Sequence, residues 1–233
     1  MHRTFGSLGL MLVGCALAPA TPARAGTCPP TTVQVGSFST ADYYIAALDT
    51  TRSGGFYPGV FNLSYDLVSG ALHVDKDINS STGAVAVNAR DAYDVAGLPG
   101  GTVVPLTAML DVNGYMESPG CGGTGCYGVC GAAIVQGAAQ VVREVSVGFS
   151  GRSDLITTLA LPISVTVGTP LVVEFDLYER ANAGGDWHGG VADAQIRFTG
   201  LPAGASIVSC YGYSGGATPA HSLSWVRLKT IYR

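Results

Sequence analysis

The stretch from Leu171 to Leu201 constrains the fold of this chain more than any other. It has the pattern of two long strands on either side of a glycine-rich loop, Ala181 to Gly190. Along the first strand, Leu171 to Arg180, side chains alternate between two faces, which indicates a strand with one face buried and the other solvated. We expect the core face to carry Leu171, Val173, Phe175 and Leu177, and the outer face Val172, Glu174, Asp176, Tyr178 and Arg180.

The same period of two recurs along most of the chain. It is clear from Ala84 to Val95, from Val104 to Val112 and from Ala132 to Phe149. The dipeptide Asn113-Gly114 favours tight turns and is expected to end the second of these strands. Further strands are predicted at Gly59–Asp66, Leu67–Val74, Leu155–Ala160, Ile163–Val167, Val191–Phe198, Ser206–Tyr213 and Leu223–Tyr232. No window shows a sustained helical stripe.

Composition supports a β-rich domain. Only 12% of the 233 residues are charged, and 33 are glycine, whereas charged residues usually make up about a quarter of a globular chain. About a dozen short strands separated by Gly, Pro and Asn turns predict two antiparallel sheets packed face to face. We therefore expect an all-β sandwich of the jelly-roll kind, formed as a single domain by residues 26–233.

Residues 1–25 have the pattern of a bacterial signal peptide. Arg3 is the basic residue, Leu8 to Leu17 form the apolar core, and Ala23 to Ala25 form a small-residue cleavage site that would release Gly26. In an alternative interpretation, the segment ending at Cys15 is a lipoprotein box and Cys15 is lipid-anchored. Both place the mature chain outside the cytoplasm, and the apolar run is too short to span a bilayer.

Charge excludes two classes of partner. The formal net charge is −4, and the chain has no cluster of lysine or arginine. Nucleic-acid binding needs a basic surface, and so does attraction to an anionic membrane. Neither partner is expected.

The cysteines predict disulfides. Of the six cysteines, five remain when Cys15 is removed with the signal peptide, so one thiol is left unpaired. The candidates are Cys28, Cys121, Cys126, Cys130 and Cys210. A bridge from Cys28 to Cys210 is favoured. Within residues 121–130 the C-x4-C and C-x3-C spacings have no nearby histidine, which favours a disulfide-stapled loop over a zinc site.

A structural calcium ion is a further hypothesis. Asp75, Asp77 and Asn79 have the D-x-D-x-N rhythm of an oxygen-ligand loop, in a segment expected to be a polar turn. Ser80 and Ala86 stand where an EF-hand needs glycine and glutamate. A turn rich in Asp and Asn, without metal, is the alternative.

Two hypotheses of function follow from side-chain chemistry. The first is a non-catalytic extracellular structural or adhesion module that binds polysaccharide or cell-envelope components through loop residues, because sugar rings stack on aromatic faces. Its candidate ligand-binding residues are Trp187, His188, Tyr127, Tyr211 and Tyr213. For Trp187, packing under a neighbouring loop is the alternative.

The second hypothesis is a secreted carbohydrate-active hydrolase. Its acid and base would come from the Glu174 and Asp176 strand, because glycoside hydrolysis needs paired carboxylates. Other acids considered are Glu179, Asp186 and Asp193. His73, His188 and His221 lack the spacing of a metal site, and no G-x-S-x-G or P-loop motif occurs.

Residues 165–213 resemble the late strands of secreted bacterial β-sandwich proteins that often end in a PEP-CTERM sorting tail. The resemblance rests on Gly168-Thr169-Pro170 before a strand and on Leu201-Pro202-Ala203-Gly204 before the next. It implies a β-sandwich and carries over no catalytic residues. The segment Ser224 to Lys229 has no Pro-Glu-Pro motif, so the resemblance does not imply anchoring by that route.

Overall fold

A computed structural model describes residues 28–36, 42–45, 49–56, 59–79, 82–118, 120, 126–182 and 187–214. These ranges contain thirteen strands and no helix. The predicted signal peptide, Cys15, Cys121, Asp186 and the predicted strand Leu223–Tyr232 lie outside them. The described part of the chain has no helix with the length and hydropathy to span a membrane.

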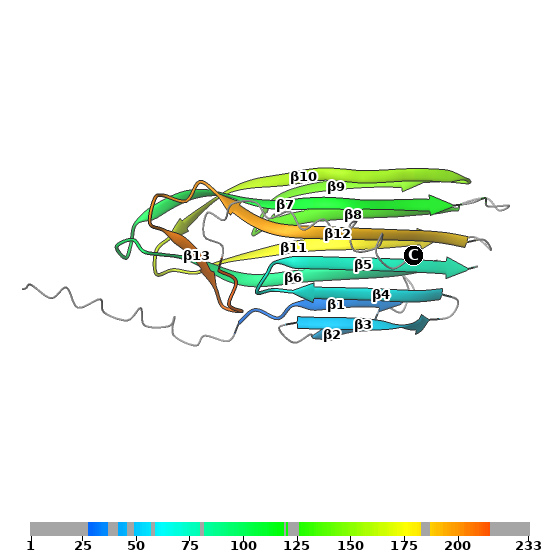
Figure 1. The fold of residues 1–233 in the computed structure, drawn as a ribbon, viewed down its shortest axis with the longest axis horizontal. Helices are drawn as coiled ribbons and strands as arrows, with labels where there is room; N and C mark the ends of the chain where they lie inside the picture. Colours follow the sequence, from blue (N-terminus) through cyan, green and yellow to red (C-terminus); the bar gives the residue numbers. More distant parts are fainter. Residues whose placement is uncertain are drawn as a thin grey trace, which may run out of the picture.

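The strands form two antiparallel sheets (Figure 1). The seven-stranded sheet has the order β2-β1-β6-β11-β8-β9, with β13 also paired to β6. Its strands are β1 (Thr32–Gly36), β2 (Asp42–Ile45), β6 (Thr82–Ala96), β8 (Tyr127–Gln136), β9 (Ala139–Val147), β11 (Leu171–Asn182) and β13 (Ser206–Ser209). The six-stranded sheet has the order β10-β7-β12-β5-β4-β3. Its strands are β3 (Asp49–Phe56), β4 (Gly59–Asp66), β5 (Ala71–Asn79), β7 (Val103–Ser118), β10 (Gly151–Thr166) and β12 (Trp187–Thr199).

The nested pairing of the eight strands from β5 through β12 defines a jelly roll. Strand β5 pairs with β12, β6 with β11, β7 with β10, and β8 with β9. The chain therefore folds like one long hairpin whose two arms pass together from sheet to sheet, which is jelly-roll topology. The predicted all-β sandwich is confirmed.

The alternation in β11 is also confirmed. Val173, Phe175 and Leu177 are fully buried between the sheets, and Tyr178 and Arg180 are partly exposed on the outer face. Four aromatic rings from β6, β11, β12 and the segment after β13 continue this core toward the β13 end. They are Tyr93, Phe175, Phe198 and Tyr213, with centroids 4.8–6.1 Å apart.

Several predicted boundaries are wrong. The predicted strand Ala132–Phe149 is two strands, because Gly137 adopts a left-handed conformation (φ 58°) in the turn that joins β8 to β9. Conversely, one strand, β10, covers both segments predicted between Leu155 and Val167. Asn113-Gly114 lies inside β7 rather than in a turn. Gly114 is needed there because a Cβ would lie 2.7 Å from the Cβ of Ala192 on β12.

The predicted Cys28–Cys210 disulfide is present and joins the segments flanking β1 and β13, with Cα atoms 5.6 Å apart. Cys126 is also disulfide-bonded. Cys130 is free and buried. The covalent framework therefore ties the two ends of the described chain together.

Gly114→Ala tests the close approach of β7 and β12. The new methyl group would meet the Cα of Ala192 and the carbonyl oxygen of Val191, both at 2.9 Å, and this backbone cannot move without disturbing the sheet. We expect a loss of about 1–3 kcal/mol in the free energy of unfolding, measured by urea denaturation. Gly148→Ala is the control, because its Cβ meets nothing within 4 Å. Equal stability of the two variants would contradict this account.

Candidate functional site

The structure does not gather the predicted aromatic residues into one site. Tyr127 begins β8 and is exposed, and Trp187 begins β12 at the same end of the sandwich. The side chain of Trp187 is not among those described. Tyr211 and Tyr213 follow β13 at the opposite end. A ligand at one end could not contact both groups.

His188 and Tyr213 are buried. The predicted loop Ala181–Gly190 is wrong at both ends, since β11 continues to Asn182 and β12 already begins at Trp187. His188 thus faces the core with no exposed surface. The Tyr213 hydroxyl donates to the carbonyl oxygen of Ile196 at 3.2 Å. Neither ring offers a face to a ligand.

Asp75 and Asp77 lie in strand β5, so the predicted polar turn is wrong. Alternate side chains on one face of a strand are roughly 7 Å apart, and they do not converge as ligands in a calcium loop do. Within the described ranges, no group of three or more His, Cys, Asp or Glu side chains is arranged to hold a metal ion. Asn79 ends β5, and its side chain is not described.

The best candidate site is a depression of about 240 Å³ on the outer face of the seven-stranded sheet. Its shape follows from the register of β6 and β11. Tyr178 and Arg180 lie opposite Ala86 and Ala84, and Asp176 lies opposite Asn88. Long side chains on one strand beside methyl groups on the next leave a hollow over β6.

Hydrogen bonds fix the polar side chains around this depression. Asn88 Nδ2 donates to Asp176 Oδ1 at 2.8 Å. The Tyr178 hydroxyl donates to Glu144 on β9, and Arg180 Nη2 donates to the same carboxylate oxygen at 2.8 Å. The Tyr178 ring crosses β8 over Gly131, where a Cβ would lie 2.4 Å from its Cζ. Gly131 is therefore required for this arrangement.

Asp176 has an unusual proton affinity. Burial and the negative charge of Glu174 together raise the pKa of its carboxyl group to about 7, against the lowering effect of the hydrogen bond from Asn88. Near neutral pH, protonated and ionised Asp176 are therefore both populated, and the carboxyl group accepts from Asn88 in either form.

The described carboxylates are divided between the two sheets. Acid and base in a glycosidase flank the scissile bond about 5–9.5 Å apart, whereas Glu174 and Asp176 lie two residues apart on the same face of β11. Glu179 is buried in the core. Asp193 lies on the other sheet, where its carboxylate contacts His73 Nδ1 at 2.8 Å. Of these four acids, Asp176 and Glu179 line the depression, and both belong to β11.

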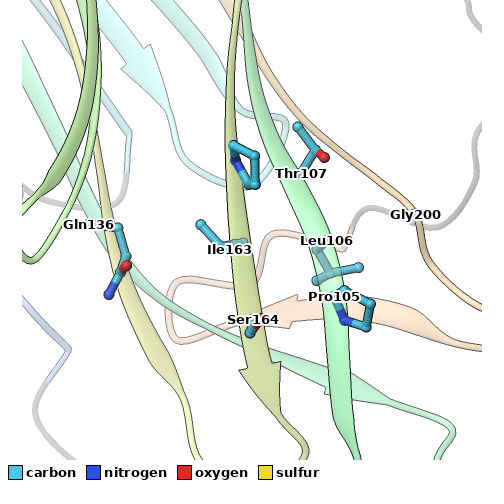
Figure 2. Close-up of a pocket in the computed structure, with 8 residues that line it drawn as sticks. Pro105, Leu106, Thr107, Gln136, Ile163, Ser164 and Gly200 are labelled. Carbon is cyan, nitrogen blue, oxygen red and sulfur yellow. The ribbon is translucent and has the colours of Figure 1, made fainter.

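A second hollow, of about 600 Å³, lies where strands β7 and β10 approach the end of β8 (Figure 2). Its lining residues, none of them charged, are Pro105, Leu106, Thr107, Gln136, Pro162, Ile163, Ser164 and Gly200. Pro162 lies on the edge strand β10 and has no N–H with which to pair another strand. Protection of the sheet edge therefore explains Pro162.

Comparisons with known proteins do not assign this chain. No family model and no curated protein matches it. Among solved structures, it is similar to the structure of infectious bursal disease virus Gx strain, with 11% sequence identity, coverage of 92% of this chain and 70% of that chain, and a TM-score of 0.19. A likeness this weak carries no argument about fold or function.

Two residues of the site were missing from the sequence-based candidates. Alternation along Ala84 to Val95 places Asn88 on the outer face, but only the register of β6 against β11 brings it to Asp176. Glu144 reaches Tyr178 and Arg180 across β8. No local signal in the sequence reports either contact.

Asp176→Asn tests the raised pKa of the site. Because the folded-state pKa exceeds the ordinary value of 3.8, the stabilisation from protonated Asp176 is present at low pH and is lost as the pH rises toward 7. Asparagine can still accept the hydrogen bond from Asn88, and it does not titrate. Relative to wild type, we expect the variant to gain stability between pH 4 and pH 8, measured by thermal unfolding.

The charged neighbours retained in this comparison are Glu174, Arg180 and Glu144, so it isolates the titration of Asp176. A stability difference between variant and wild type that stays constant across this pH range would contradict the assignment.

Proposed function

We propose that this protein is a non-catalytic extracellular β-sandwich module, of the structural or adhesion kind, that binds polysaccharide in the depression between β6 and β11. The observation that carries the proposal is the grouping of Asn88, Asp176, Tyr178 and Arg180 around one hollow. Amide, carboxyl and guanidinium groups are planar and can hydrogen-bond two neighbouring hydroxyls of a sugar.

The size and openness of the depression favour a polymer. Sites that enclose small molecules usually measure roughly 300–1,000 Å³, more than the 240 Å³ found here. A chain of sugars lying along the sheet needs no enclosure. This geometry supports binding at the sheet face rather than at the loop aromatics.

An extracellular location is supported by the Cys28–Cys210 disulfide, since disulfides persist in oxidising compartments, and by the signal-peptide pattern. The absence of paired carboxylates across the depression favours binding over hydrolysis. Asp176 has a pKa suited to a general acid, but its nearest carboxyl is on the same strand.

Binding is tested with the purified mature chain on an array of neutral, acidic and amino-sugar polysaccharides. Asn88→Ala removes one hydrogen-bonding group from the depression. We expect it to weaken the Kd for the bound polymer about tenfold, the effect of losing a hydrogen bond of about 1.4 kcal/mol. Asn113→Ala, at an exposed asparagine on the outer face of the six-stranded sheet, is the matched control.

Two results would refute this proposal. The first is no binding to any polymer on the array. The second is binding that Asn88→Ala leaves unchanged; if Trp187→Ala or Tyr127→Ala abolishes that binding, the ligand lies at the β8 and β12 end of the sandwich.

A further inference from the structure

Four polar side chains, two from each sheet, are buried in the interior. Lys76 on β5 and His188 on β12 come from the six-stranded sheet, and Glu179 on β11 and Cys130 on β8 come from the seven-stranded sheet. None is more than 1% exposed. Glu179 also lines the outer-face depression, whereas the other three do not.

Gly190 leaves room for the carboxyl group of Glu179 at the residue that is paired with Lys76. A Cβ at Gly190 would lie 2.8 Å from Cδ and from both carboxyl oxygens of Glu179. Glu179 therefore reaches across to the backbone of β12, at the residue paired directly with Lys76. Opposite residues in antiparallel strands have Cα atoms about 4.5–5.5 Å apart, a span within reach of the four methylene groups of lysine.

Neither group has a hydrogen-bond partner. Lys76 Nζ and both carboxyl oxygens of Glu179 are buried and unpaired. An uncompensated charge in a protein interior costs several kcal/mol. Even an uncharged polar group that is buried without a partner costs about 1–3 kcal/mol.

Burial also favours the neutral form of each group. It lowers the pKa of Lys76 to about 8, against the opposing attraction of Glu179. It raises the pKa of Glu179 well above its ordinary value, although Lys76 acts in the opposite direction. An uncharged amine beside an uncharged carboxylic acid is the pair of species that condenses to an amide.

We propose that Lys76 and Glu179 form an intramolecular amide bond that links the two sheets. The nitrogen lone pair of neutral Lys76 attacks Cδ of protonated Glu179, and a C–N bond forms. The C–OH bond breaks, the hydroxyl takes a proton from the nitrogen, and one water leaves. No oxidant or other reactant is required.

The bond would complement the disulfide. Glu179 pairs with Val85 near the start of β6, whereas Cys210 N donates to the carbonyl oxygen of Ala92 near the end of that strand. The two cross-links would therefore lie toward opposite ends of the sandwich. This inference is independent of polysaccharide binding.

Intact mass spectrometry of the denatured, reduced wild-type protein tests the bond. We expect a mass about 18 Da below that of the processed sequence, the mass of one water. The chain has only two lysines, Lys76 and Lys229, so a lysine-specific protease gives a second readout. It should fail to cut after Lys76, and the peptide containing Glu179 should remain attached to that lysine.

Lys76→Met and Glu179→Ala should each abolish the deficit, and Lys229→Met, the matched control, should retain it. Wild-type protein with its full sequence mass and normal cleavage after Lys76 would overturn the proposal. That measurement needs no variant, so a failure of the variants to fold cannot obscure the result.

Discussion

The nested pairing of β5 to β8 with β9 to β12 is the constraint on which the rest of the structure depends. A side-chain period of two means that a slip of one residue in any pair would exchange the core face for the outer face. The register therefore determines where the two acidic side chains of β11 discussed above lie. It places Asp176 outward against Asn88 and Glu179 inward beside Gly190. Fold and site are set by the same hydrogen-bond ladders.

The alternation of apolar and polar side chains made most strands predictable, whereas the structural roles of several glycines were difficult to predict. The faces of β11 followed from its polar pattern because one side of the strand meets a core. Glycines at 114, 131 and 190 suggested turns or loops, yet each lies in a strand where a neighbouring group occupies the space of a Cβ. Close approach and chain reversal both select glycine. The residues that distinguish them, Ala192, Tyr178 and Glu179, lie on other strands.

The candidate site was predictable in part for the same reason. The outward positions of Asp176, Tyr178 and Arg180 follow from a single strand. Their partners Asn88 and Glu144 belong to β6 and β9, whose neighbours are set by topology. The prediction that the aromatic residues form one binding site was wrong. A glycine beside an aromatic residue does not show at which end of the sandwich the ring lies or whether it is buried. Tyr127 is exposed, whereas Tyr213 lies in the core.

The alternation along β11 also places a carboxyl group in the core. Glu179 continues the inward series of Val173, Phe175 and Leu177. Apolar residues of similar volume commonly stabilise a fold as well as a buried ion pair does, or better. Stability alone therefore does not account for Lys76 opposite Glu179. Condensation would replace the buried amine and carboxyl group with a neutral amide, and Gly190 leaves space for the Glu179 carboxyl group beside the residue paired with Lys76.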